Sequence, residues 1–183
     1  YLGTKSFYVV SVTGLFIGLA FSLQVMTEFV KFGAGSMIGG VVGLAVCREL
    51  SPLMTGIVLV GRVGSGLTAE ISSLKISEQL DAFEALAKPV SQWIYVPRFL
   101  AITFMAPCLT VWSNLVGIFS GYLVVYFSNM VNSAGYFESL QSFLSVWDIL
   151  GSLIKAIVFA IVIGGLGCYF GQNVEGGTQG VGI

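Results

Sequence analysis

Four long runs of apolar residues, separated by polar segments, set the pattern of this chain. Three of them read as single helices: residues 7–30, residues 99–127 with a kink expected at Pro107, and residues 149–170. A helix that crosses the hydrocarbon core of a membrane needs about 20 mostly apolar residues, and each run reaches that length. The pattern therefore predicts an all-α fold, a polytopic transmembrane helical bundle with four spans.

The second apolar region, residues 37–69, contains a polar interruption. As one straight helix it would be about 50 Å long, well beyond the ~30 Å hydrocarbon core. The sequence Arg48-Glu49-Leu50-Ser51-Pro52 lies near its middle. Proline has no amide hydrogen to donate, and it disfavours helical geometry at the residue before it. We therefore expect a break or a helix start here, followed by a span over residues 53–69.

The polar segment between the second and third spans, residues 70–98, predicts a short amphipathic helix. Apolar residues recur in it at helical spacing, with charged residues on the opposite face. The apolar positions are Ile76, Leu80, Phe83 and Ala87, and the charged ones are Glu78, Asp81, Glu84 and Lys88. We expect this helix to begin near Ser77, since acidic residues suit the positive end of the helix dipole, and to end at Pro89.

Basic residues predict the orientation of the spans. Residues 70–98 include three lysines or arginines, whereas the second polar loop, residues 128–147, has none. Cytoplasmic loops of membrane proteins carry an excess of such residues. The amphipathic helix should therefore lie in the cytoplasm and the second loop outside. Four spans then place both ends of this segment on the cytoplasmic side.

The composition agrees with a lipid environment and excludes nucleic-acid binding. Hydrophobic residues make up 56% of the 183 residues and charged residues only 9%, against about 25% charged in an ordinary soluble domain. The net charge of −1 offers no basic surface for nucleic acid. The cysteines, Cys47, Cys108 and Cys168, lack the spacing of a metal site or a disulfide framework. We expect them to be buried thiols.

The sequence carries no motif for catalysis. The glycine-rich stretch at residues 61–66 lacks the lysine of an ATP-binding loop. No nucleophile elbow or metal motif is present either, and the chain has no histidine. We therefore expect this chain not to be an enzyme and to bind no metal ion or cofactor. If ATP drives the protein, a partner subunit binds it.

Three ionisable residues within the apolar regions, Glu49, Arg62 and Lys155, are the candidates for function. A charge at the centre of a membrane helix costs at least about 2.5–3.5 kcal/mol, so such residues are usually functional. The predicted topology puts Glu49 and Lys155 in the outer half of the membrane, where an outward-facing cavity would bind the polar head of an amphiphile. Structural alternatives stay open. Glu49 would be an acid at a helix start, and Arg62 and Lys155 would extend to the membrane interface.

A series of ordered motifs runs through the centre of the chain. They are Arg48-Glu49-Leu50-Ser51-Pro52, Gly61-Arg62-Val63-Gly64-Ser65, Ala69-Glu70, Glu78-Gln79-Leu80-Asp81-Ala82 and Val96-Pro97-Arg98. In these motifs the chain resembles the MlaE-type permeases, the membrane subunits of ABC transporters that work with MCE proteins. The resemblance covers almost the whole chain. It implies a single permease domain over residues 1–183, without the family's N-terminal interfacial helix and last transmembrane helix.

The resemblance also implies a function and an assembly. Such permeases move phospholipids or related lipids between membranes, driven by separate ABC ATPase subunits. The implied partners are a second copy of the chain, the ATPases and an MCE-domain protein on the outer side. The implied location is the bacterial inner membrane, with the plastid inner envelope as the alternative.

Roles for individual residues follow from the same resemblance. Glu49 and Lys155 would line the lipid cavity. The amphipathic helix would be the coupling helix seated on the ATPase, with contacts from Glu78, Gln79, Asp81, Phe83 and Glu84. The remaining motif positions would be structural: Arg48, Pro52, Arg62, Glu70, Pro97 and Arg98.

Two other functions remain compatible with the residues themselves. An ion-coupled secondary carrier would use Glu49 as its ion site and need no ATPase. A membrane scaffold would only anchor partners and transport nothing.

Overall fold

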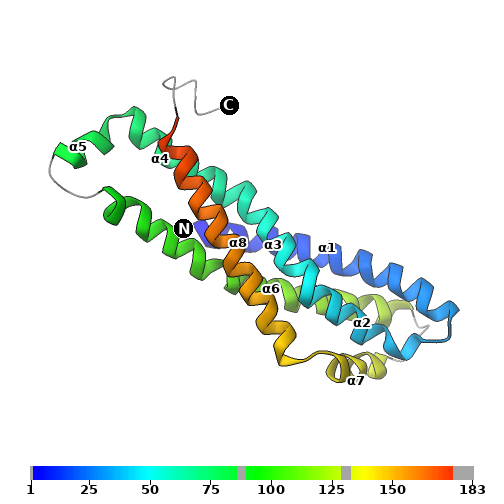
Figure 1. Cartoon of the computed structure of the whole chain (residues 1–183). Helices are drawn as coiled ribbons and strands as arrows, with labels where there is room; N and C mark the ends of the chain where they lie inside the picture. The colour runs from blue at the N-terminus through cyan, green and yellow to red at the C-terminus, as the bar shows by residue number, and fades with distance from the viewer. Residues whose placement is uncertain (1, 86–89, 129–132, 175–183) are drawn as a thin grey trace.

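A computed structural model describes residues 2–85, 90–128 and 133–174 of the chain (Figure 1). Within these ranges the regular structure is helical throughout, with no strand, as the sequence predicts. The helices are α1 (Leu2–Lys31), α2 (Ile38–Ala45), α3 (Ser51–Leu59), α4 (Ser65–Ile76), α5 (Gln79–Ala85), α6 (Val96–Ser128), α7 (Ser133–Phe143) and α8 (Val146–Gln172).

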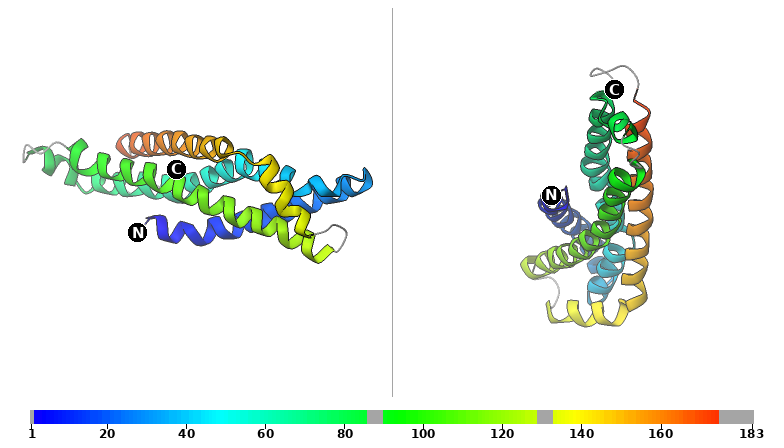
Figure 2. Two further views of the ribbon diagram at one scale, coloured as in Figure 1. Left: turned by 90° about the horizontal axis from the view of Figure 1, so that it is seen from below. Right: turned by 90° about the vertical axis from the view of Figure 1, so that its left-hand side faces the viewer.

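Four stretches of the described chain are long and apolar enough to cross a membrane. They are Ser6–Lys31, Gly35–Ile76, Trp93–Ser128 and Val146–Gln172. These stretches lie side by side, with α5 beyond one end of the bundle and α7 lying across the other (Figures 1 and 2). We call these the α5 end and the α7 end. The predicted four-span bundle is confirmed, and the chain is an integral membrane protein.

Of the two alternatives expected between Arg48 and Pro52, the break is wrong, because the helix continues from Gly35 to Ile76 over 42 residues, but an α-helical segment, α3, does begin at Ser51. Two π-helical turns, Val46–Leu50 and Val60–Gly64, join α2, α3 and α4. In the first turn the Ser51 amide donates to the Val46 carbonyl, five residues back. A π-helical turn shifts the hydrogen bonds by one residue. Pro52 then falls in the first turn of α3, where a missing amide is tolerated.

The α5 end differs in detail from the predicted loop. The second span continues as helix to Ile76, so Glu70 is helical. Ser77 ends α4 instead of starting the next helix, because its amide and its hydroxyl both donate to the Ser73 carbonyl, at 3.0 and 2.8 Å. Glu78 has a φ of 57°, which turns the chain, and the predicted short helix begins at Gln79. The predicted helix end at Lys88 and Pro89 lies outside the described residues.

The second polar loop also proves to be largely helical, since α7 occupies most of it. Tyr136, on α7, is only 2% exposed, and its hydroxyl donates to the Ile118 carbonyl of α6 at 3.1 Å. Burial, aided by the nearby Cys47, raises the pKa of this phenol, so it remains a neutral donor. Tyr136 therefore anchors α7 to the spans.

One expectation for the cysteines is wrong. Cys47 is buried and Cys168 is half-buried, but Cys108 is exposed on α6. In a membrane protein an apolar thiol on the outer surface faces lipid and needs no burial in protein, which composition alone does not reveal.

The spans are held together by two separate apolar clusters. The cluster nearer the α5 end joins α1, α3, α4, α6 and α8, and includes Leu59, Leu67, Ile102, Leu109 and Ala160. The cluster nearer the α7 end joins α1, α2, α6 and α7, and includes Met26, Val42, Val46, Val125 and Tyr136. Buried polar residues lie between these two clusters along α6, among them Ser113 and Asn114.

Glycine allows α1 and α6 to cross in close contact. A Cβ added at Gly18 would lie 2.5 Å from the Gly117 carbonyl oxygen and would also overlap the Ser120 hydroxyl. Small residues of this kind permit helices to approach closely in lipid, where packing replaces the hydrophobic effect as the driving force.

This contact gives a test of the packing. Gly18→Ala should destabilise the purified protein by about 1–3 kcal/mol, because the added methyl group overpacks the crossing. Gly165→Ala is the matched control: it lies within α8, and a Cβ there meets nothing within 4 Å. Thermal unfolding in detergent measures both. Equal melting temperatures for the two variants would contradict the close crossing.

Candidate functional site

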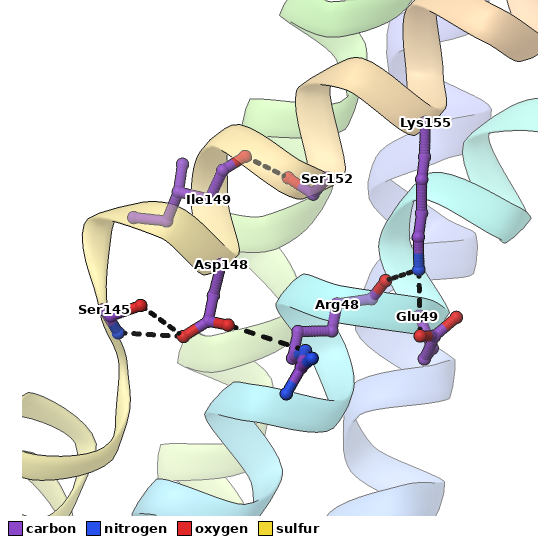
Figure 3. Close-up of polar contacts among 7 residues, drawn as sticks. All are labelled: Arg48, Glu49, Ser145, Asp148, Ile149, Ser152 and Lys155. Atoms are coloured by element: carbon purple, nitrogen blue, oxygen red, sulfur yellow. Dashed lines mark hydrogen bonds and ion pairs between the residues drawn. The ribbon is translucent and has the colours of Figure 1, made fainter.

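Four charged side chains pair across the junction between the second span and α8 (Figure 3). Lys155 Nζ lies 2.9 Å from Glu49 Oε1, and Arg48 Nε lies 3.5 Å from Asp148 Oδ1. We call these four residues the ionic face. The structure thus brings together Glu49 and Lys155, the two residues predicted to share a cavity.

Helical geometry explains the crossed pairing. Asp148 and Lys155 are seven residues apart, so they lie two turns apart on one side of α8. Arg48 and Glu49 are sequence neighbours within the first π-helical turn and point in different directions. Arg48 reaches towards the start of α8, and Glu49 meets Lys155 further along it (Figure 3). Opposite charges on two helices therefore fix their relative position at two levels.

Lys155 also contacts the main chain beside Pro52. Its Nζ donates to the Arg48 carbonyl oxygen at 2.8 Å. In an uninterrupted α-helix the amide of residue 52 would donate to that carbonyl, but proline has no amide hydrogen. The lysine supplies a donor to a carbonyl group that the proline cannot serve. Lys155 therefore stabilises the π-helical turn that precedes Pro52.

Asp148 is fixed from its own helix. The Ser145 amide and the Ser145 hydroxyl both donate to Asp148 Oδ2, at 3.0 and 2.9 Å. Asp148 lies in the first turn of α8, where an acidic side chain is favoured by the helix dipole. Its other oxygen remains directed at Arg48. The start of α8 thus presents a carboxylate in a defined position.

The ionic face lies on the outer surface of the single chain. The Glu49 side chain is 72% exposed and the Lys155 side chain 45% exposed, although both residues belong to membrane-spanning stretches. Charges facing hydrocarbon are costly, so residues of this kind face protein or a water-filled cavity. No helix starts at Glu49, which removes the helix-start explanation for this residue. Lys155 meets a carboxylate, which argues against simple extension to the interface.

An apolar groove begins one turn beyond the ionic face. It runs between α8 and the α3–α4 side of the second span and has a volume of about 520 Å³. Leu53 and Phe159 line it, each four residues after Glu49 and Lys155. Its other lining residues include Ile57, Val60, Val162, Leu166 and Phe170. A charged region therefore adjoins a long apolar surface along the same two helices.

A second apolar groove lies between α1 and α6 and reaches α7. It has a volume of about 800 Å³, and its lining includes Leu15, Trp112 and Phe119 but no charged residue. The Trp112 indole N–H donates to the Ser11 hydroxyl at 2.8 Å. No charged residue lines either groove, but the first begins one turn from the ionic face, so it is the better candidate for a site that recognises a head group.

The other predicted residues lie elsewhere. Arg98 Nη2 pairs with Glu70 Oε2 at 3.2 Å and ties α6 to α4, in agreement with a structural role. Pro97 is in the first turn of α6. Arg62 is exposed in the second π-helical turn, away from the ionic face. In the described ranges no group of three or more potential ligands could hold a metal ion.

The predicted coupling residues are separate from the ionic face, since they lie at the opposite end of the second span. Glu78 and Gln79 are exposed, and Phe83 is half-buried. The side chains of Asp81 and Glu84 lie outside the described part of the chain. Their contact with an ATPase stays a prediction.

Sequence reasoning missed Asp148 as a site residue and classed Arg48 as structural only. A signal was present: Asp148 and Lys155 share one side of their helix, and Arg48 and Glu49 offer the complementary charges. Pairing these residues requires knowledge that the two helices are neighbours, which no local pattern supplies.

The fold and this site define an integral helical membrane protein with a charged and apolar surface on one side of its bundle. The chain belongs to the MlaE permease family, because the family model described as Permease MlaE matches residues 1–183. The resemblance identified from the central motifs is confirmed, and the chain is a transporter permease subunit.

Individual relatives agree with this assignment. A probable ABC transporter permease of Synechocystis is 38% identical over 99% of this chain and 69% of its own length. A probable ABC transporter permease of Rickettsia typhi is 36% identical over 100% of this chain and 70% of its own. The chloroplastic protein TRIGALACTOSYLDIACYLGLYCEROL 1 of Arabidopsis thaliana is 36% identical over 98% of this chain, which spans 51% of that protein.

The pairing of Glu49 with Lys155 is testable by a double-mutant cycle. Glu49→Gln and Lys155→Met should each destabilise the protein, and the double variant should lose less than the sum. We expect a coupling energy of about 0.5–3 kcal/mol. The exposed pair Glu28–Lys31, with its atoms 3.0 Å apart, is the control. Its cycle should give about 0.2–0.5 kcal/mol. Unfolding in detergent measures both, and additive effects at Glu49 and Lys155 would contradict the pairing.

Proposed function

We propose that this chain is the permease subunit of an ATP-driven transporter that moves phospholipid or a related lipid between membranes. The observation that carries the proposal is the ionic face at the end of the apolar groove. A phospholipid has the same two parts, a charged head group and apolar chains. The name of the Arabidopsis relative refers to a glycerolipid, which also favours a lipid cargo.

The proposed binding mode assigns each part of the cargo to a part of the site. Lys155 and Arg48 would attract the phosphate of the head group, and Glu49 would attract an amine where the head group has one. The acyl chains would lie against the groove residues, such as Ile57 and Val162. Cargo binding would then exchange the Glu49–Lys155 ion pair for contacts to the head group, while Asp148 would keep its two hydrogen bonds from Ser145.

Energy for this transport would come from a partner subunit. The sequence has no ATP-binding motif, whereas the bacterial relatives are named probable ABC transporter permeases. We propose that the ATPase binds the α5 end, through α5 and the exposed Glu78 and Gln79. ATP would be bound by that partner and not by this chain. The α5 end would then be the cytoplasmic side, in line with its basic residues.

The remaining parts of the assembly are proposals of the same kind. A second copy of the chain would cover the ionic face, because four charges within spans require protein or water beside them. An MCE-domain protein would dock at the α7 end, on the outer side. The bacterial relatives favour the bacterial inner membrane, and the chloroplastic relative keeps the plastid inner envelope as the alternative.

The groove can be tested with two neighbouring residues of α8. Val162 lines the groove and is 51% exposed, whereas Ile161 does not line it and is 45% exposed. Val162→Trp should reduce lipid transfer at least tenfold, because the indole fills space that the acyl chains need. Ile161→Trp should leave transfer nearly unchanged. Transfer of fluorescent phospholipid between reconstituted vesicles measures this. Equal rates for both variants, with normal assembly, would exclude the groove as the lipid path.

The energy source is tested with the natively purified complex. Mass spectrometry should find an ATP-binding subunit, a second permease copy and bound phospholipid. Lipid transfer in vesicles should require ATP and stop with a non-hydrolysable analogue. Transport that continues without ATP and follows an ion gradient would instead support the secondary carrier with Glu49 as its ion site. A complex that carries no lipid and transfers none would support the scaffold.

A further inference from the structure

A set of buried polar side chains is carried by α3, α6 and α8 midway along the bundle. We call it the polar seam, and its members are Ser51, Thr55, Thr110, Ser113, Asn114 and Ser152. Each is at most 6% exposed. The seam separates the two apolar clusters: on α6, Leu109 belongs to the first cluster and Val124 to the second. Apolar packing is therefore interrupted midway along the bundle.

Asn114 has a hydrogen-bonding atom that the protein leaves without a partner. Its Nδ2 lies 3.3 Å from the Ser152 hydroxyl, but its Oδ1 is buried and has no partner. Turning the amide over only exchanges the two atoms, so one of them always lacks a partner. A buried polar atom in that state costs about 1–3 kcal/mol. The seam therefore has a place for another hydrogen-bonding group.

Thr55 has the same property on the facing helix. It is 1% exposed, and its hydroxyl has no hydrogen-bond partner. Thr110, equally buried on α6, instead donates to its own helix, at the Ala106 carbonyl, at 2.9 Å. Thr55 lies one turn from Ser51 and one turn from Leu59. Both of these neighbours face α6: Leu59 packs in one cluster with Leu109, and Ser51 shares a cavity with Ser113. Thr55 lies between them on the same side of α3, so it also faces α6.

That small cavity adjoins the seam. It lies where α1, α6 and the start of α3 meet, has a volume of about 10 Å³, and is lined by both Ser51 and Ser113 together with Gly14, Gly18 and Gly117. A space of about 10–15 Å³ with polar partners is enough for one water molecule. Thr55 and Asn114 do not line this cavity, so it offers space for one water molecule at the edge of the seam, beside Ser51 and Ser113.

We propose that the polar seam binds internal water, held by Thr55 and Asn114, and that this water lets α3 move against α6 and α8. Water satisfies the orphan atoms in more than one helix position, whereas interlocked apolar side chains fix a single position. The flanking π-helical turns at residues 46–50 and 60–64 give α3 two ends at which its hydrogen bonds can shift. The water site stands independently of the cargo. Its role in movement rests on the proposed transport function.

The test compares Thr55→Val with Thr110→Val in the full complex. Both changes remove a buried hydroxyl at nearly constant volume, but only Thr55 holds water in this proposal. Thr55→Val should lower lipid transfer at least threefold without lowering the melting temperature, because the proposed partner of this hydroxyl is a water molecule and no protein group bonds it. Thr110→Val removes a hydroxyl that bonds its own helix and should leave transfer unchanged. A merely structural role for Thr55 would lower stability and transfer together and would overturn the proposal.

A second experiment looks for the water directly. It determines the structure of the complex in lipid nanodiscs at a resolution that shows ordered water. Density within hydrogen-bonding distance of Asn114 Oδ1 and Thr55 Oγ1, lost at the Thr55 position in Thr55→Val, is the expected result. A dry seam in the unmodified protein would overturn the water site. A hydrated seam in a complex that transfers no lipid would leave the water site standing, and would refute the role in movement together with the proposed cargo.

Discussion

The cost of charge inside a membrane governs how this bundle is arranged. Arg48, Glu49, Asp148 and Lys155 all belong to membrane-spanning stretches, and each has an opposite charge within 3.5 Å. Removing one partner would leave the other charge beside hydrocarbon. The two ion pairs therefore fix α8 against the second span at two levels. The apolar groove lies beside these charges because the same two helices continue past them.

The π-helical turn before Pro52 and the charged side chain of Lys155 depend on each other. A proline inside a membrane helix leaves a carbonyl without its usual donor, and no water is present in hydrocarbon to replace it. Here Lys155 donates to the Arg48 carbonyl, and a π-helical turn carries the helix past the proline. The lysine thus serves the main chain and Glu49 at once. In the proposed function, an incoming head group would compete for this lysine, which would link cargo binding to the shape of the second span.

Packing divides the bundle into parts of different character. Glycine contacts bring α1 and α6 together at the Gly18 crossing, and apolar clusters consolidate each end. Between the clusters the contacts are polar. Apolar side chains that interlock resist sliding, whereas hydroxyl and amide groups exchange partners at low cost. A transporter needs rigid segments and a place where they move; the apolar clusters would supply the first and, in our proposal, the polar seam the second.

The sequence by itself determined the fold class, the four spans, the presence of a short helix between the second and third spans, and the family, because apolar runs and ordered motifs are local properties. It also singled out Glu49 and Lys155, since isolated charges in apolar runs stand out by composition alone. Only the tertiary structure decided that Glu49 meets Lys155, that Arg48 meets Asp148, and that the helix continues through Pro52. Those outcomes depend on which helices are neighbours and on donors supplied from a distant part of the chain, and a local pattern contains neither.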